Sequence, residues 1–275
     1  VARHLEHSNM AWALDDGQLA PLVALRDSLE RADLSLRHRW LFQTEVVSLG
    51  DIGRRNDYPA FEHELSGRRR AAVDAIFSAN GLDGVLEFAE QVDPWVVGVS
   101  LGNASAPVER ELLALIPSES PTVSSVAAGY FAARLRQKDA PTDSLLDEFE
   151  EPDKQAFILR YLPDQTDAQS RLDGLDARVA GLYWRNFNYL GLGADFTKAL
   201  DAGWSLIDAG RPVAALMLNF LYLRDTPPSE ETADLFAAAL DALLAKPDPD
   251  PEMQNLHRYE LERIFEVLSI HRDHI

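Results

Sequence analysis

The stretch that decides the fold class is Ser229–Lys246, which reads SEETADLFAAALDALLAK. Its apolar residues recur every three or four positions, which is the spacing of one face of an α-helix. Acidic residues fall on the opposite face, and Ser229 can accept hydrogen bonds from the free N–H groups of the first turn. The two glutamates that follow Ser229 suit the positive end of the helix dipole, and Lys246 suits the negative end. The stretch therefore predicts an amphipathic helix that ends before Pro247.

The same pattern recurs outward from this stretch along most of the chain. Apolar stripes at helical spacing occur at 82–92, 108–116 and 261–268. Proline marks many expected helix starts, because its missing N–H costs nothing in the first turn. The dipeptides that carry this signal are Asp93-Pro94, Ala106-Pro107, Ser120-Pro121, Glu151-Pro152, Arg211-Pro212 and Asp250-Pro251. These signals predict about fourteen helices of roughly 8–22 residues, and the short connections make consecutive helices antiparallel neighbours.

From residue 82 onward the expected helices fall into pairs. The pairs are 82–92 with 94–104, 107–116 with 121–137, 143–150 with 152–162, 195–210 with 212–224, and 229–245 with 252–270. The unit length of about 30 residues is near the period of helical-repeat solenoids, although the residues do not repeat cleanly. The only β-branched runs of note, at 45–49 and 95–99, are too few to build a sheet.

The predicted fold class is therefore all-α, with stacked antiparallel helical hairpins that form an α-solenoid-like array. Residues 1–80 are less regular, and we expect them to form an N-terminal helical subdomain. Residues 81–275 are expected to form the helical-hairpin repeat region, either beside that subdomain or continuous with it as one domain.

Three segments carry a resemblance to known proteins: Tyr183-Trp184-Arg185, residues 208–216 (DAGRPVAAL) and residues 259–265 (YELERIF). They resemble patterns in long helical regions of large uncharacterised bacterial proteins. More broadly, the chain is similar to the HEAT and tetratricopeptide class of α-solenoids, although the full tetratricopeptide signature is missing. The resemblance implies a stacked helical array and assigns no functional residues.

Composition limits the classes of function. The chain has 275 residues, no cysteine and a formal net charge of −19. Without cysteine it has no disulfide, thiolate metal site or cysteine nucleophile. An acidic surface repels phosphate backbones, so nucleic-acid binding is disfavoured. No stretch reaches the ~18 apolar residues of a membrane span, so we expect a cytoplasmic protein without a membrane partner. The start at Val1 and the end just after an apolar helical pattern predict a fragment of a longer polypeptide.

One motif points to catalysis. Gly98-Val99-Ser100-Leu101-Gly102 matches G-x-S-x-G, which in α/β-hydrolases holds a nucleophilic serine on a sharp turn between a strand and a helix. The chain lacks the strands for the surrounding sheet and an upstream oxyanion segment. The preferred interpretation is a helix whose two glycines allow close packing, with Ser100 as the weaker nucleophile candidate.

Other clusters have structural and functional readings. The aromatic residues Tyr183, Trp184, Phe187 and Tyr189 are expected to fill the core, and the alternative is an exposed patch that binds a protein partner. The acidic residues of 147–153 are expected to form a solvated edge rather than a Ca²⁺ site. The histidine pairs His4/His7 and His271/His274 share helix faces, but no third ligand accompanies either pair, so no metal site is predicted.

These features favour a non-catalytic scaffold that binds proteins, or a sensor region, within a larger bacterial protein. Its partner would be a separate protein or a neighbouring domain of the same chain, and no cofactor is expected. The alternative is a serine hydrolase that uses Ser100.

Overall fold

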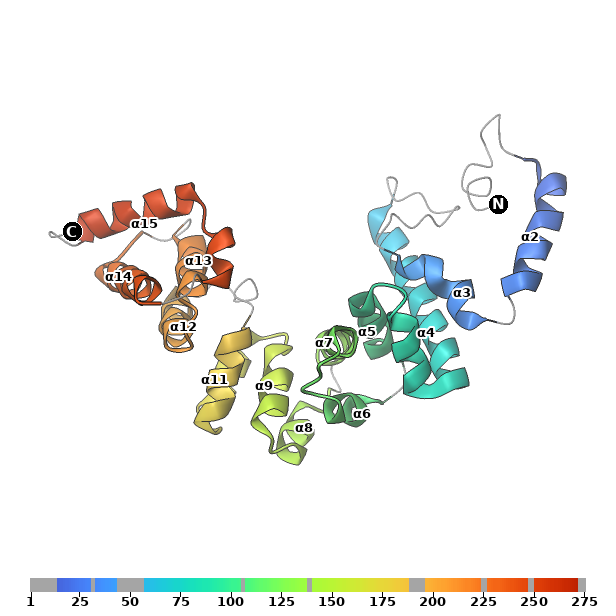
Figure 1. The fold of residues 1–275 in the computed structure, drawn as a ribbon, viewed down its shortest axis with the longest axis horizontal. Coiled ribbons are helices and arrows are strands. Elements are labelled where there is room, and N and C mark those ends of the chain that lie inside the picture. Colours follow the sequence, from blue (N-terminus) through green and yellow to red (C-terminus); the bar gives the residue numbers. More distant parts are fainter. Residues whose placement is uncertain are drawn as a thin grey trace. The chain divides into compact units, whose positions relative to one another are not determined.

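The computed structural model describes residues 14–30, 33–43, 57–104, 107–137, 140–187, 196–223, 227–246 and 250–271 (Figure 1). Within these ranges every regular element is a helix and none is a strand, which confirms the all-α prediction. The run 95–99, noted for its β-branched residues, is helical, whereas 45–49 lies outside the described residues. Contacts between helices group the chain into two compact units, Val1–Pro141 and Thr142–Ile275.

The first unit begins with a short N-terminal set of helices and a long kinked helix. Its described elements are α2 (Asp16–Glu30), α3 (Leu34–His38), the 3₁₀ turn η1 (Arg39–Phe42), α4 (Tyr58–Ala89), α5 (Pro94–Gly102), α6 (Glu109–Ala114) and α7 (Pro121–Arg134). Helix α4 bends at Gly81, where φ is +66° and ψ is −163°. Only glycine adopts this conformation readily, because it has no Cβ. The subdomain boundary expected after residue 80 coincides with this bend, and the contacts group both arms of α4 in one unit.

Helices α5 and α7 make the most extensive contact in the first unit. Glycines occupy the places where the two backbones approach. A Cβ added to Gly98 would lie 2.1 Å from the carbonyl oxygen of Val126, and one added to Gly129 would lie 2.3 Å from that of Trp95. Such distances are shorter than any contact a real side chain makes, so only glycine permits this approach. The close packing predicted for the glycines of the G-x-S-x-G motif is therefore confirmed.

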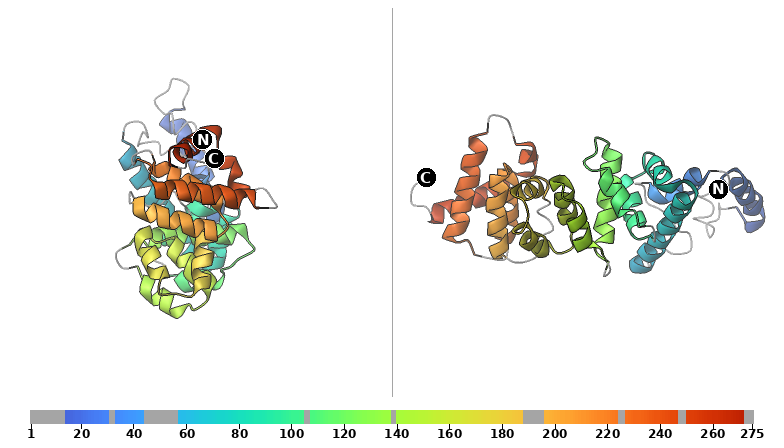
Figure 2. Two further views of the ribbon diagram at one scale, coloured as in Figure 1. Left: turned by 90° about the vertical axis from the view of Figure 1, so that its left-hand side faces the viewer. Right: turned by 90° about the horizontal axis from the view of Figure 1, so that it is seen from below.

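The second unit contains the remaining helices. They are α8 (Thr142–Glu148), α9 (Pro152–Arg160), α10 (Gln165–Leu172), α11 (Ala177–Asn186), α12 (Phe196–Asp208), α13 (Pro212–Tyr222), α14 (Glu230–Leu244), the 3₁₀ turn η3 (Pro251–Asn255) and α15 (Arg258–His271). Helices α12 and α13 lie side by side in both views of Figure 2, where they are orange. Apolar side chains of α12 to α15 and the η3 connection form one core, which includes Leu216, Phe236, Leu256, Ile264 and Leu268.

Most of the predicted helix starts are found in the structure, but the start expected at Pro107 is not, because α6 begins at Glu109. Ser229 caps α14 and forms a reciprocal capping box with Thr232. Proline occupies the first turn of α5, α7, α9, α13 and η3, as expected. The prediction for Lys246 is wrong in detail, because α14 ends at Leu244 and the lysine instead pairs with Asp250, 2.9 Å away.

Helices that correspond to the expected pairs contact each other, namely α4 with α5, α6 with α7, α8 with α9, α12 with α13 and α14 with α15. Two expected helices differ in extent, because 82–92 belongs to α4, which begins at Tyr58, and 252–270 divides into η3 and α15. Two of the larger contacts, however, join helices that are not consecutive, α5 with α7 and α9 with α11. The intervening helices α6 and α10 have only six and eight residues. Because such short helices cover little surface, the longer helices on either side pack directly against each other.

Candidate functional site

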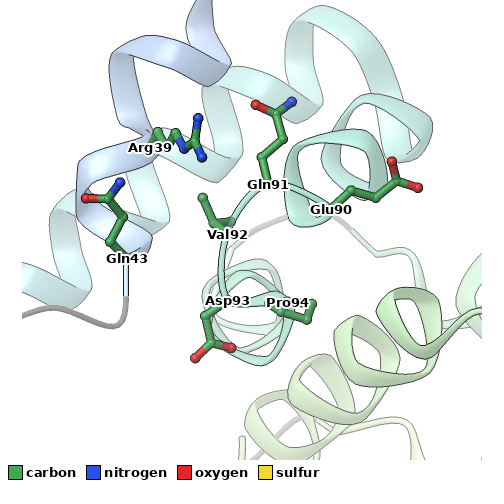
Figure 3. A pocket seen from close by; sticks show the side chains of 7 residues that line it. All are labelled: Arg39, Gln43, Glu90, Gln91, Val92, Asp93 and Pro94. Atoms are coloured by element: carbon green, nitrogen blue, oxygen red, sulfur yellow. The ribbon is translucent and has the colours of Figure 1, made fainter.

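The described residues form an open pocket in the first unit, where η1 meets the corner between α4 and α5 (Figure 3). Its volume is about 630 Å³. Two short segments supply the lining side chains, which are Arg39, Gln43, Glu90, Gln91, Val92, Asp93 and Pro94. The pocket therefore joins residues that lie about fifty positions apart in the sequence.

The η1 wall is fixed by contacts with both arms of α4. Phe42 is fully buried, and its ring meets that of Phe88 edge to face at 5.2 Å between centroids. Arg69 donates a 2.7 Å hydrogen bond from Nε to the carbonyl oxygen of Leu41, and its guanidinium lies 5.9 Å from the Phe42 ring centre. Burial lowers the pKa of Arg69, while Glu62 and Asp93 act in the opposite direction. Buried aromatic packing and a charge-assisted hydrogen bond together hold η1 in place.

The opposite wall is fixed by the start of α5. Asp93 accepts hydrogen bonds from the backbone N–H groups of Trp95 and Val96, which satisfies two donors that a helix start leaves free. Its own backbone N–H donates to the carbonyl oxygen of Phe42 at 3.2 Å. Pro94 supplies the first helical position, so the local sequence dictates where the corner turns.

Four of the lining side chains are polar and exposed: Arg39, Gln43, Glu90 and Gln91. Within the described part of the chain, none of these four side chains has a hydrogen bond or an ion pair. In the view of Figure 3 the oxygen of the Gln91 amide lies on the side of Arg39 and its nitrogen on the far side, whereas Gln43 and Glu90 extend outward to the left and the right. The pocket thus offers free donors and acceptors on rigid supports, which suits recognition of a ligand.

The chemistry of this pocket is limited by its residue types. The lining holds no histidine, serine or lysine, and its ionisable side chains are Arg39, Glu90 and Asp93. Among the described residues of the whole chain, no three metal-ligating side chains come together.

Ser100 lies within helix α5 and not on a turn after a strand. Its side chain is 5% exposed, and its hydroxyl donates a 2.8 Å hydrogen bond to the carbonyl oxygen of Val96 in the same helix. The described residues provide no strand to feed a nucleophile elbow, and no histidine is recorded as a partner of this hydroxyl. The local geometry needed for an activated serine is absent from this part of the structure.

Three of the four predicted aromatic residues are buried in the second unit. Tyr183, Trp184 and Phe187 are 0%, 9% and 2% exposed, and their ring centroids lie 4.9–5.4 Å apart. Burial raises the pKa of Tyr183. These three side chains are core residues, as expected. The alternative, an exposed aromatic patch that binds a protein partner, is wrong for them because they are buried. Tyr189 lies outside the described residues.

Arg211 closes this aromatic cluster on one side. Its guanidinium donates to the carbonyl oxygens of Trp184 and Phe187 at 3.0 and 2.7 Å, and it binds both carboxylate oxygens of Glu252 at 3.1 and 2.6 Å. The arginine therefore satisfies carbonyls at the end of α11 and ties that helix to η3. This polar cluster is fully used in holding the fold together.

The remaining candidates from the sequence are the acidic segment 147–153 and the two histidine pairs. The acidic side chains Asp147, Glu148, Glu150, Glu151 and Asp153 are all exposed where α8 meets α9, and Glu151 pairs with Lys154 at 2.7 Å. His271 lies in the last turn of α15, whereas His4, His7 and His274 lie outside the described residues.

The pocket residues were not anticipated from the sequence. Asp93 and Pro94 were recognised only as a helix start, and Arg39 and Gln91 look like ordinary surface residues. The sequence offers one signal for this pocket, the apolar pair Leu41-Phe42 near Arg39, which is buried in the structure. An apolar pair of this kind indicates that the polar residues beside it are anchored to the core.

Comparison of the chain with protein-family models, with curated proteins and with solved structures found no match. Among the described helices, none combines the length and the apolar character that crossing a bilayer requires.

Proposed function

We propose that this protein is a non-catalytic scaffold that binds another polypeptide, as part of a larger bacterial protein built from stacked helical hairpins. The partner is a separate protein or a neighbouring domain of the same chain. The observation that carries the proposal is the pocket between η1 and the α4–α5 corner, whose four exposed polar side chains have no partner within the described structure. A surface with free donors and acceptors on a rigid support is suited to molecular recognition.

The remaining polar clusters support the same proposal. Arg211 and Glu252 pair with each other, and so do Arg134 and Glu109, at 2.8 Å. These buried or half-buried groups are engaged in ion pairs within the fold. Helical arrays of the solenoid class, which the sequence resembles, present such surfaces to protein partners.

The serine hydrolase alternative gains no support from the geometry of Ser100, whose hydroxyl is engaged within its own helix. We expect a fluorophosphonate probe to leave Ser100 unlabelled. Covalent labelling of Ser100, detected by mass spectrometry of the tryptic peptide, would restore the hydrolase.

The scaffold is tested by affinity capture from the source cells with three baits. The baits are the wild-type chain, the Arg39→Glu variant, and the control Arg70→Glu, which makes the same change at an exposed position of α4. We expect the wild type and the control to enrich the same protein, and the pocket variant to lose it. If the wild type enriches nothing beyond an unrelated acidic protein, the scaffold is wrong.

A further inference from the structure

Helix α13 is apolar on nearly every side. Its sequence is PVAALMLNFLY, in which only Asn219 and the final Tyr222 carry a nitrogen or an oxygen in the side chain. Residues 213–216 are all 0% exposed, and four consecutive residues of an α-helix span more than one full turn. The helix contacts α12, α14, α15 and η3, so neighbouring elements cover several of its sides. Apolar spacing therefore does not specify which side of α13 meets α12.

Asn219 is the polar side chain inside this apolar helix, and it is fully buried. Its Nδ2 donates a hydrogen bond to the carbonyl oxygen of Ala199 in α12 at 3.2 Å, and another to that of Ala215 in α13 at 3.1 Å. The two N–H groups of the amide thus link the two helices at one defined place. A rotation of α13 about its axis would carry the amide away from Ala199 and leave a buried N–H group without this acceptor.

Helix α12 leaves room for this amide at Gly203. A Cβ added to Gly203 would lie 2.4 Å from Nδ2 of Asn219 and 2.5 Å from Cδ1 of Leu235 in α14. Both distances are shorter than a real side chain permits, so the missing Cβ opens a space that the amide and Leu235 fill. Ala199 and Ala202, which precede Gly203 in α12, are also small and fully buried. The surface of α12 therefore accommodates the amide at one position.

The amide is an unfavourable choice for stability alone. Its Oδ1 is buried and has no hydrogen-bond partner among the described residues. A buried acceptor without a partner destabilises the folded state, and an apolar side chain of similar shape would avoid that loss. In coiled coils, a single buried asparagine fixes the register and the number of helices although it lowers stability. The same reasoning applies to α13, because one amide distinguishes a side that apolar residues leave equivalent to the others.

We infer that Asn219 is a positioning residue that fixes the rotation of α13 about its own axis, through the carbonyl oxygen of Ala199 and the space at Gly203. The amide selects one arrangement of the core of the second unit from several that apolar packing alone permits. The inference goes beyond the proposed scaffold function and does not depend on it, since the pocket that carries that proposal lies in the first unit.

The test counts the conformations of this core in the full chain labelled with ¹⁵N. Asn219→Leu keeps the branched shape of the side chain, and Asn219→Ala removes the amide without adding volume. We expect each variant to show a second set of amide resonances, or broadened ones, for residues 199–206 and 213–219, because α13 then adopts more than one rotation. The wild-type protein should show a single sharp set for the same residues.

Leu216→Ala is the matched control, because Leu216 is also a fully buried residue of α13 and its truncation leaves Asn219 in place. This change should lower the urea midpoint of unfolding, as the creation of a cavity does. It should nevertheless leave a single set of resonances. The number of conformations, and not the stability, then separates Asn219 from a residue that only fills the core.

The inference is overturned if a folded Asn219 variant keeps a single sharp set of resonances, because apolar contacts alone would then fix α13. It is also overturned if Leu216→Ala doubles or broadens the same resonances, because any weakening of the core would then loosen the helix. If Asn219→Leu does not fold, because its methyl groups are too large for the space at Gly203, Asn219→Ala decides the question by itself.

Discussion

At the scale of single residues, the glycines of α5 and α7 matter through the atoms they lack. Gly98, Gly102 and Gly129 lie where a Cβ would come within 2.1–2.4 Å of a backbone carbonyl oxygen of the facing helix. Backbone atoms cannot move aside as a flexible side chain can, so the two helices would have to separate. The G-x-S-x-G pattern is thus explained by helix packing, without reference to catalysis.

Replacement of Gly129 by alanine should therefore destabilise the protein. We expect Gly129→Ala to lower the free energy of unfolding by about 1–3 kcal/mol, the usual cost of overpacking a tight interior. Gly67→Ala is the matched control, because a Cβ at Gly67 in α4 meets nothing within 4 Å. Since alanine favours helix, the control should be neutral or stabilising by up to about 1 kcal/mol. Urea unfolding followed by circular dichroism measures both, and equal effects would contradict the close-packing explanation.

At the scale of elements, Arg211 connects three parts of the second unit. Its guanidinium binds the end of α11 through two carbonyl oxygens and η3 through Glu252, while its own backbone precedes α13. The planar fork of arginine makes these contacts simultaneously, which the point charge of lysine cannot do. The positions of α11, α13 and η3 are therefore coupled through one side chain.

We expect Arg211→Gln to cost about 2–3 kcal/mol of stability, because it leaves Glu252 and two helix-end carbonyls without their donor. Arg258→Gln is the control, since Arg258 forms its 2.6 Å pair with Glu262 in an exposed position, with 91% and 60% of the two side chains accessible. Exposed pairs contribute about 0–0.5 kcal/mol, so this change should have little effect. Thermal unfolding of the two variants compares them directly, and similar midpoints would show that the Arg211 contacts are not stabilising.

The short element η1 also carries a titratable group at its start. His38 precedes η1, and its pKa lies below the ordinary value of 6.5, chiefly because of burial and secondly because of Arg37. In the folded protein the neutral form is favoured, so the unfolded chain binds more protons at mildly acidic pH. Stability from this group is present above about pH 6.5 and declines as the pH falls through the pKa of the folded state.

The lowered pKa of His38 predicts a pH dependence of stability that is absent when His38 is replaced. When the pH is lowered from about 7.5 to about 5.5, wild-type protein should lose more stability than His38→Gln. The reason is that only the wild-type chain takes up a proton at residue 38 as it unfolds. Urea unfolding at both pH values measures the two differences, and other titrating groups cancel in the comparison. An identical pH dependence in the two proteins would show that His38 is not coupled to folding.

At the scale of the whole molecule, the chain consists of two compact units that meet in sequence between Pro141 and Thr142. Gly129 belongs to the first unit and Arg211 to the second. The contacts described for Gly129 and those described for Arg211 have no residue in common, so we expect the effects of the two substitutions to be independent.

The double variant Gly129→Ala with Arg211→Gln tests this division. We expect its loss of stability to equal the sum of the single losses within about 0.5 kcal/mol. In differential scanning calorimetry, each single variant should lower the transition of its own unit. If the protein shows one common transition and either variant lowers it, the two units unfold together as one cooperative structure.

The sequence by itself determined the fold class and the helix starts, because these depend on nearby residues. Apolar spacing specified the helices, and the prolines together with Ser229 specified where several begin. The core position of Tyr183, Trp184 and Phe187 could also be predicted, since their spacing covers more than one helix face.

Only the tertiary structure decided which helices pack together and where the pocket lies. The packing of α5 on α7 across the short α6 depends on the lengths of all three helices and on glycines in two of them. The pocket joins Arg39 to Gln91 because buried contacts of Phe42 bring distant segments together, and no local pattern encodes that meeting. Local hydrogen bonding and periodicity act over a few residues, whereas packing is settled by the fit of whole surfaces.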